Sequence, residues 1–358
     1  QRRRLSASAH RSKMSVAKTI TLIEPLDAGL PGPEHFRIVE TPVPTTLEND
    51  GDIIVQALVF SADPYMRGQI KTGRGMVAGG TMKGFIAGKV LKSRNANWVE
   101  GDLFGASLPL STVQVVSGDA LTKTMIWKLT EFIDESQISL GVGVLGMPGS
   151  TAYGGLIDVL RPNKGETIFV SAASGAVGGL VGQIAKTQYN CTVVGSAGGA
   201  EKGTILKEKF GFDHAIDYKT VDDAAGLIGK LKEAVPDGID MYFENVGGIH
   251  WDAALATLRP HGRVAVCGCI SGYNDALPKP NELFIGQMIY TFQRIEGFMC
   301  APWLTGKKGN FLKDMSAWLK EGHLKIEETF FDGIEQWPAG FQSLFTGANK
   351  GKVVVRVA

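Results

Sequence analysis

The sequence predicts an α/β protein of two domains, in which an irregular β-rich domain precedes a doubly wound, parallel six-stranded sheet. Its 358 residues exceed what one hydrophobic core usually organises. Up to about residue 145, short β-rich runs such as 52–60 and 84–91 are broken by Gly and Pro clusters. From Glu166 onward, apolar β-branched runs alternate with helical stretches, which is typical of βαβ units and a parallel sheet.

Six apolar runs supply the predicted parallel strands, and this number suits a complete dinucleotide-binding sheet. They lie at 167–171, 191–196, 214–218, 238–247, 263–269 and 292–299. A helix at about 309–321 precedes a last strand at 351–358, which we expect to return to the first domain. We therefore expect residues 16–145 and 322–358 to form the first domain and 146–321 the second, with 1–15 a disordered leader or tag.

Composition limits the classes of partner. Hydrophobic residues make up 44% and charged residues 20%, as in ordinary globular proteins. The net charge is +1, but residues 1–13 hold five of the basic residues. The remainder therefore carries 32 basic against 36 acidic residues, and this lack of excess positive charge makes it a poor candidate for nucleic-acid binding. Four cysteines without paired spacing favour a reducing compartment, and no apolar run reaches the length of a membrane span. We expect a cytoplasmic protein, or a mitochondrial one if residues 1–13 are a transit segment.

A glycine fingerprint follows the first parallel strand. In SAASGAVGGLVGQIAK, Ala173, Gly175 and Gly178 occupy the three positions of a Gly-x-Gly-x-x-Gly pattern with alanine first. Small residues let the backbone approach a pyrophosphate, and the helix N-terminus offers free N–H groups to it. The alternative, a merely tight turn, is disfavoured because a strand precedes the pattern and a helix follows it.

The end of the second strand indicates which dinucleotide binds. NAD-specific sites place an acid there, but the sequence reads VVGSAGGAEK, so the candidates are Ser196 and Lys202, with Tyr218 after the third strand. A cation pairs with a 2′-phosphate and therefore favours NADPH. The alternative for Lys202 is a solvated helix residue.

A catalytic zinc site would need three protein ligands. Residues 16–145 hold no cysteine, and His35 is their only histidine. Cys267 and Cys269 stand at i and i+2 of an apolar strand, which predicts buried core thiols. We therefore expect no metal.

Seven ordered blocks after Met14 resemble the zinc-independent medium-chain dehydrogenases/reductases of the leukotriene B4 12-hydroxydehydrogenase, 15-oxoprostaglandin 13-reductase and alkenal double-bond reductase group. The blocks are DPYMRG, GMPGSTAYGG, AASGAVGG, AGGAEK, PDGIDMYFENVGG, CGCISGYN and GANKGKVVVRV. The resemblance implies a GroES-like substrate domain, a Rossmann domain that binds NADPH, reduction of the C=C bond of α,β-unsaturated aldehydes or ketones, and a homodimer. The stretch 76–88 departs from some relatives near the substrate side and leaves substrate size open.

The resemblance also implies site residues, block by block. Cofactor contacts fall on Gly175, Ala176, Val177, Gly178, Gly179, Lys202, Tyr218, Asn245, Cys267, Gly268, Cys269, Ile270, Ser271, Gly272, Tyr273, Phe298, Met299, Cys300 and Asn349. Tyr65 and Tyr273 match tyrosines that face the substrate, and Tyr273 is the first candidate to stabilise the enolate oxygen that forms when hydride adds to the β-carbon. The alternative for each tyrosine is a packing role. Quinone reduction and non-catalytic NADPH binding stay open as other functions.

Overall fold

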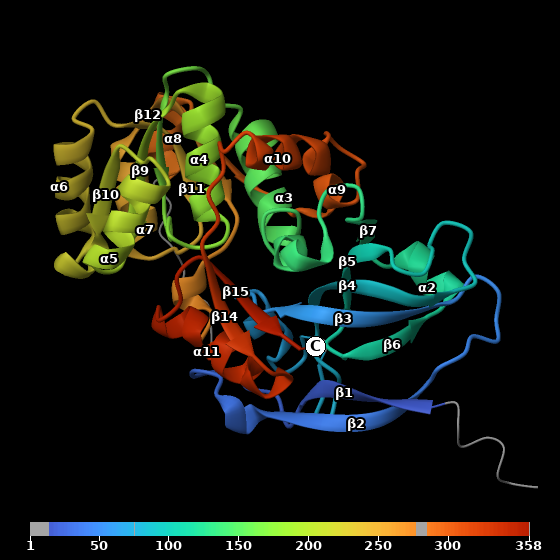
Figure 1. Ribbon diagram of the computed structural model, residues 1–358. Coiled ribbons are helices and arrows are strands. Elements are labelled where there is room, and N and C mark those ends of the chain that lie inside the picture. Colours follow the sequence, from blue (N-terminus) through green and yellow to red (C-terminus); the bar gives the residue numbers. More distant parts are fainter. Residues whose placement is uncertain (1–13, 75, 277–284, 358) are drawn as a thin grey trace, which may run out of the picture.

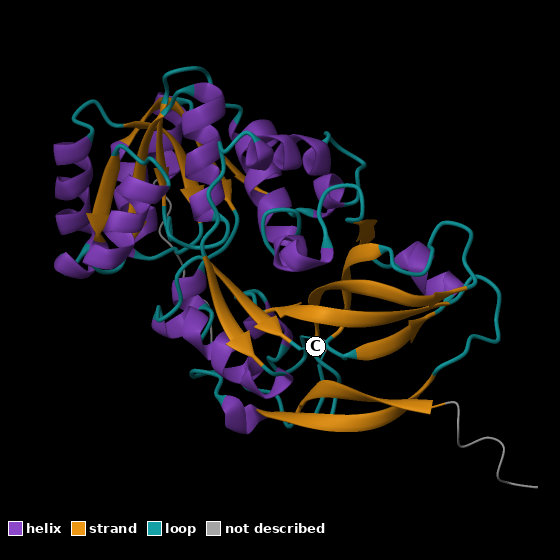
Figure 2. Cartoon of the chain, in the orientation of Figure 1, coloured by secondary structure: helices purple, strands orange, loops and turns teal. Residues whose placement is uncertain are grey.

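The computed structural model describes residues 14–74, 76–276 and 285–357, and it folds into two domains, the first with two sheets and the second with one (Figures 1 and 2). Residues 1–13 of the expected leader lie outside the described part of the chain. Residues 14 and 15 belong to strand β1 (Met14–Leu22), which pairs with β2 (Phe36–Pro44) from Met14↔Pro44 onward. Residues 14 and 15, which we expected in the leader, therefore belong to the first domain, because the β1–β2 ladder includes them.

The second domain is built on a parallel sheet of six strands, counted over the described residues, in the order β10-β9-β8-β11-β12-β13. The strands are β8 (Thr167–Val170), β9 (Thr192–Ala197), β10 (His214–Asp217), β11 (Ile239–Glu244), β12 (Leu258–Val266) and β13 (Arg294–Gly297). In chain order this is the 3-2-1-4-5-6 arrangement of a Rossmann sheet. All six predicted strands are present, and the predicted fold class is confirmed.

Helices cover both faces of this sheet (Figure 2). They are α3 (Met147–Gly154), α4 (Gly178–Tyr189), α5 (Ala200–Thr204), α6 (Ala224–Ala234), α7 (Ile249–Thr257), α8 (Ile285–Thr291), α9 (Ala301–Leu304) and α10 (Phe311–Lys320). Side chains alternate along a strand, so Ile168 and Val170 of β8 join a core with α3, α4 and α10, whereas Phe169 joins another with α6 and α7. Burial on both faces explains why these strands read as continuous apolar runs.

The first domain contains a mixed sheet in the order β14-β15-β3-β4-β5-β7, with β6 also paired to β3, as far as the described residues show. Its strands are β3 (Ile53–Ser61), β4 (Lys83–Ser93), β5 (Leu103–Pro109), β6 (Val113–Val116), β7 (Ile126–Lys128), β14 (Glu328–Asp332) and β15 (Lys352–Arg356). The helices α1 (Met66–Gln69), α2 (Gly118–Lys123) and α11 (Trp337–Thr346) flank it. Strand β15 pairs antiparallel with β3, so the C-terminal tail adds a strand to this sheet.

One apolar core runs through the junction of the two domains. It joins Phe85 and Trp127 of the first domain to Leu156 and to the α4 face of the second sheet. The Trp127 indole donates to the carbonyl of Leu145 within this junction. A shared core fixes the first domain against the carboxyl ends of the parallel strands. No helix in the described ranges has the length and hydropathy needed to cross a membrane.

Candidate cofactor and substrate site

The candidate site lies where β8 and β11 run side by side at the centre of the parallel sheet. From β8 the chain continues to β9 on one side of the sheet's centre, and from β11 it continues to β12 on the other side. The strand order therefore reverses between β8 and β11, which makes this place a switch point. Ligands of doubly wound sheets bind at the carboxyl ends of the strands at such a switch point. The glycine-rich loop 171–177 leaves β8 at this place, and the loop 245–248 leaves β11 beside it.

The glycine-rich loop packs closely against the start of helix α4 because its residues are small. A Cβ on Gly178 would stand 2.6 Å from the Ala172 carbonyl oxygen and 2.9 Å from Ala173 Cα, so helix α4 starts tight against the loop. Ala172 has a positive φ of 48°, which turns the chain sharply after the strand. The loop also pairs with the C-terminal segment through Gly175 and Gly351. The residues present therefore fit a dinucleotide pyrophosphate, with Ala176, Val177 and Gly179 at the helix entrance.

A buried carboxyl group ties the two loops together. Glu244 Oε1 accepts hydrogen bonds from Ser171 Oγ at 3.1 Å and from Gly247 N at 2.9 Å. Asn245 Nδ2 donates to the Ser171 carbonyl at 2.8 Å, which fixes the predicted cofactor residue Asn245 over the first turn. Burial raises the pKa of Glu244, because the ionised carboxylate is poorly solvated there.

Positive charge gathers at the end of the site where the 2′-phosphate is predicted. Burial lowers the pKa of Lys202, and the neighbouring ammonium groups of Lys219 and Lys350 lower it further. Lys202 Nζ donates to the Gly347 carbonyl at 2.7 Å, and Lys350 pairs with Glu201. Mutually repelling cations held together in this way suit a doubly charged phosphate.

Two further predicted contacts lie beside these lysines. A Cβ on Gly198 would stand 3.1 Å from the Tyr218 hydroxyl and 2.9 Å from Lys219 Cε, so both side chains border the turn after β9. Asn349 Nδ2 donates to the Gly351 carbonyl, in the segment that meets the glycine-rich loop. Lys202, Tyr218 and Asn349 are thus brought to one end of the site.

Ser196, the other candidate for the 2′ position, points elsewhere. Its side chain is buried, and its hydroxyl hydrogen-bonds with Nε2 of His250 at 2.8 Å. His250 stacks on Phe169 and meets the Tyr218 ring edge-on at 5.1 Å. Burial lowers the pKa of His250 to about 4, so the ring is neutral at physiological pH. The Ser196 hydroxyl is therefore used inside the core, which leaves Lys202 as the better of the two candidates for the 2′ position.

At the opposite end, residues 267–273 form a loop instead of the end of a strand. Strand β12 stops at Val266, since Cys267 N and Gly268 N both donate to the Glu244 carbonyl. Ile270 N and Ser271 N then bond to the loop after β11, and a 3-10 turn covers Ile270–Gly272. The prediction of two buried core thiols on a strand is consequently wrong. Cys269 is exposed and Cys267 is half-buried.

Tyr273 closes this loop on itself. Its hydroxyl accepts a hydrogen bond from Cys269 N at 3.3 Å and lies above Gly268, where a Cβ would stand 2.9 Å away. Burial raises the pKa of Tyr273, so the phenol stays protonated at neutral pH. A hydroxyl that accepts from a backbone N–H keeps its own proton for another acceptor.

Tyr65 enters the same region from the first domain, at the start of helix α1. Its ring packs edge-on against Phe85, with centroids 6.2 Å apart. Burial raises its pKa well above the usual value, and the neighbouring Asp63 and Cys300 add to this effect. Cys300 also neighbours Cys267, whose pKa burial raises to about 12. Tyr65 of the first domain thus lies near Cys300, which follows the carboxyl end of β13.

The remaining predicted segment, 298–300, follows β13. The Phe298 ring packs against Phe243 and Trp303 in the interior, whereas Met299 is 77% exposed. A side chain that is fixed in the core leaves the backbone as the part of Phe298 available to a ligand.

Sequence reasoning missed the residues that join the two domains beside Tyr273. Arg67, one of the largest fully buried side chains, donates to Asn274 Oδ1 at 3.0 Å, and Lys71 donates to the Asp275 carbonyl at 2.6 Å. It also missed Lys219 and Lys350 of the cationic group. Their only signal in the sequence was proximity, since Lys219 follows Tyr218 and Lys350 follows Asn349.

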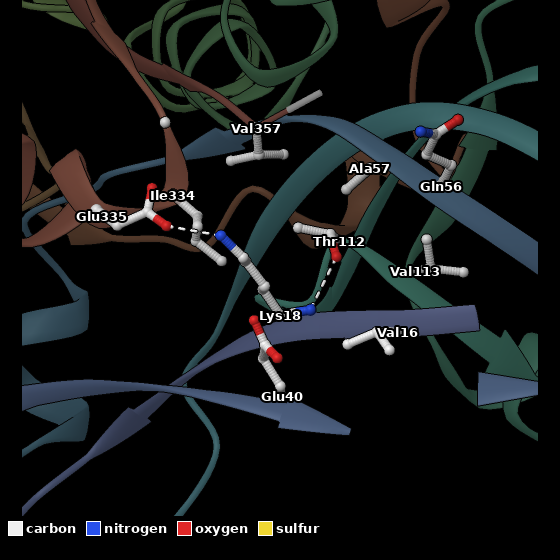
Figure 3. A pocket seen from close by; sticks show the side chains of 11 residues that line it. Val16, Lys18, Glu40, Gln56, Ala57, Thr112, Val113, Ile334, Glu335 and Val357 are labelled. Carbon is white, nitrogen blue, oxygen red and sulfur yellow. Dashed lines mark hydrogen bonds and ion pairs between the residues drawn. The ribbon is translucent and has the colours of Figure 1, made fainter. Parts of the chain in front are cut away.

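A cavity of about 540 Å³ lies elsewhere in the first domain, and none of its lining residues is a predicted site residue. Figure 3 shows it between β1, β2 and the C-terminal segment, where the Lys18 ammonium meets Glu335 at 2.9 Å. Because its charged side chains already pair with one another, this cavity is a poor match for the predicted chemistry.

Over the described ranges, no group of three or more His, Cys, Asp or Glu side chains has the arrangement that could hold a metal ion. Metal independence stays a prediction, since only an assay of the protein can test it.

The fold and the site define a two-domain oxidoreductase that binds a dinucleotide at the switch point of its parallel sheet. Residues 18–124 match a family profile described as the N-terminal domain of oxidoreductase, and residues 176–310 match one described as zinc-binding dehydrogenase. Prostaglandin reductase 1 of Mus musculus is 38% identical over 343 residues, which cover 96% of this chain and 100% of that protein.

Two other proteins are similar over almost the whole chain. The 2-alkenal reductase (NADP(+)-dependent) of Nicotiana tabacum is 40% identical over 87% of this chain and 89% of its own. The crystal structure of CurA from Vibrio vulnificus in complex with NADPH has a TM-score of 0.83 at 33% identity, and covers 95% of this chain and 99% of its own. The chain belongs to the zinc-independent medium-chain dehydrogenase/reductase family of which prostaglandin reductases and alkenal reductases are members. The predicted family is confirmed.

Proposed function

We propose that this protein reduces the C=C bond of α,β-unsaturated aldehydes or ketones. The coarser part of this function, an NADPH-dependent oxidoreductase that acts on C=C bonds, follows from relatives that match the chain along nearly its whole length. The finer part, the enal or enone substrate, rests on one observation. A protonated phenol, Tyr273, lies in the loop predicted to line the nicotinamide, and Tyr65 of the other domain lies near Cys300, in the second predicted nicotinamide segment.

Charge stabilisation is the chemistry that the protein's own residues must supply. When bound, NADPH would supply a hydride to the β-carbon, and the α-carbon would take a proton from water or a hydroxyl. Negative charge would then develop on the carbonyl oxygen. The Tyr273 hydroxyl can donate to that oxygen, because it accepts a hydrogen bond from Cys269 N–H and its own proton is not used in that bond. The second phenol, Tyr65, lies at the start of α1 and borders the substrate from the first domain.

The cofactor is assigned to three groups of residues. Gly175 to Gly179 receive the pyrophosphate, the lysine cluster Lys202, Lys219 and Lys350 with Tyr218 receives the 2′-phosphate, and Asn245 and Asn349 border the path between them. The backbone of 267–273 and 298–300 lines the nicotinamide. In support, Gly178 lets helix α4 start directly against the glycine-rich loop, which brings the helix N-terminus to the loop. The cationic cluster holds more positive than negative charge.

Steady consumption of NADPH with a simple enone tests the proposal. We expect NADPH oxidation with nonenal or benzylideneacetone, loss of the C=C bond in the product, and no consumption with the saturated analogue. A protein that consumed NADPH only with quinones would be a quinone reductase instead. A protein that bound NADPH but oxidised it with neither class would be a binding protein, and both results would contradict the proposal.

We also propose that the protein is a homodimer joined through β13, the last strand of the parallel sheet. Ile289, Tyr290 and Phe292, which precede this strand, are between 67% and 83% exposed. If two copies of β13 paired antiparallel about Ile295, Arg294 of one copy would face Glu296 of the other. Light scattering should give a dimer for the wild type and a monomer for Tyr290→Glu; a monomeric wild type would contradict it.

A further inference from the structure

We infer that Arg67 is a positioning residue that fixes Tyr273 relative to Tyr65, across the junction of the two domains. The inference rests on the proposed function, because it gives Tyr273 a task at the substrate carbonyl. Its physical basis is separate and consists of a group of hydrogen bonds between the first domain and residues 274–275.

Arg67 is fully buried, and each nitrogen of its guanidinium group has an acceptor. Nη1 donates to the Leu26 carbonyl at 2.7 Å and Nη2 to the Gly29 carbonyl at 3.2 Å, which hold the loop 26–29 of the first domain. Nε donates to Asn274 Oδ1 at 3.0 Å, across the junction. The planar guanidinium thus orients three acceptors at fixed angles, which lysine could not do.

Residues 274–275 receive two more bonds from the first domain. Gly29 N donates to the Asn274 carbonyl at 2.8 Å, so Asn274 is held by its backbone as well as by its side chain. Lys71 Nζ donates to the Asp275 carbonyl at 2.6 Å. The chain directly after Tyr273 is therefore anchored to the first domain.

The chain before Tyr273 is anchored to the second domain. Ser271 bonds to the Val246 carbonyl through both its backbone N–H and its hydroxyl, and Ile270 N bonds to the Asn245 carbonyl. Tyr273 consequently stands between two anchors on different domains. Since Tyr65 and Arg67 belong to one turn at α1, the anchor that holds Asn274 also sets the distance between the two tyrosines.

Misplacing a catalytic group by a fraction of a bond length costs rate, whereas binding of the distant phosphates is unaffected. We therefore expect Asn274→Ala, which removes only the side-chain acceptor, to lower kcat for enone reduction at least fivefold. The Kd for NADPH should change less than twofold. Asn274→Asp, which keeps an oxygen in place for the guanidinium, should retain wild-type kcat.

A double-mutant cycle and an activity-independent readout complete the experiment. Arg67→Ala should lower kcat at least as much as Asn274→Ala, and the double variant should be no slower than Arg67→Ala alone. Hydrogen exchange of the amides of 272–275 should be faster in Asn274→Ala than in the wild type. Exchange can be read even if the wild type reduces no enone, which separates failure of this inference from failure of the proposed function.

Arg263 offers a matched control. It is a largely buried arginine that donates to the Leu160 and Arg161 carbonyls and pairs with Glu166, on another part of the second domain. Arg263→Ala should destabilise the fold while leaving kcat per folded molecule and exchange of 272–275 unchanged. Wild-type kcat and exchange in Asn274→Ala would overturn the inference, as would equal losses in Asn274→Asp and Asn274→Ala.

Discussion

Replacing Lys202 with alanine should weaken NADPH binding selectively. The Lys202 ammonium is held by the Gly347 carbonyl at 2.7 Å, and Lys219 and Lys350 are close enough to lower its pKa. A hydrogen bond to a charged group contributes about 1.5 to 3 kcal/mol, which corresponds to a factor of about 10 to 150 in Kd. Because two cations remain in Lys202→Ala, we expect a loss of about tenfold to a hundredfold.

Ligands that differ only at the 2′ position give the cleanest assay. Calorimetry or fluorescence quenching should show the loss for NADPH and for 2′,5′-ADP, whereas binding of NADH and of 5′-AMP should hardly change. Raising the salt concentration should weaken wild-type binding of NADPH more than that of NADH, since salt screens the phosphate contact. Lys207→Ala is the matched control, because Lys207 is exposed five residues further along the same helical segment.

An equal loss of affinity for NADPH and NADH in Lys202→Ala would refute the reasoning. It would mean that the side chain supports the fold of the turn after β9 through Gly347, without meeting the phosphate. A wild type that uses both cofactors equally well would refute the assignment of the whole lysine cluster.

Three other outcomes can be measured on the same protein. Tyr273→Phe should lower turnover at least tenfold under single-turnover conditions with nearly unchanged NADPH affinity, and turnover within twofold of wild type would assign the role to Tyr65 or the cofactor. Treatment with a chelator should leave activity intact, and stoichiometric zinc whose removal abolishes activity would contradict this. His250, with its pKa lowered from 6.5 to about 4, stabilises the fold above its unfolded pKa and loses that effect as pH falls. The free energy of unfolding should therefore drop by about 2 kcal/mol between pH 7 and pH 5, and urea titrations should show a smaller drop for His250→Gln.

The second domain could be predicted from the sequence because its signals are local. Strands buried on both faces require continuous apolar runs, and a helix that starts against a strand requires a residue without Cβ, as Gly178 shows. Each of these requirements is met within a few neighbouring residues. Six strands and the glycine-rich loop followed directly from them.

The end of β12 could not be predicted in the same way. Its apolar run continues through Cys267, but the strand ends at Val266 because the Glu244 carbonyl draws Cys267 N and Gly268 N into the loop. The hydrogen-bond acceptor that ends this strand belongs to a distant part of the chain, so the local sequence does not reveal it. The alternation of inward and outward side chains expected along a longer β12 therefore predicted a buried Cys269, which is exposed.

The cationic cluster could be predicted only in part for a related reason. Lys202, Lys219 and Lys350 come from segments far apart in the sequence, and each alone looks like a solvated surface residue. Only the return of the C-terminal strand to the first domain brings Lys350 beside Lys202. Nothing in the sequence around Arg67 distinguishes it from an exposed arginine, although its side chain is fully buried.

The two domains touch at both ends of the proposed cofactor site. At the phosphate end, Gly351 N donates to the Ser174 carbonyl at 3.0 Å and Lys202 Nζ donates to the Gly347 carbonyl. At the nicotinamide end, Arg67 reaches Asn274. A dinucleotide that lies between these contacts must be bordered by both domains along its length, so its binding and the relative placement of the domains are coupled. The substrate would then meet a surface to which Tyr65 and Tyr273 contribute from opposite sides of the junction.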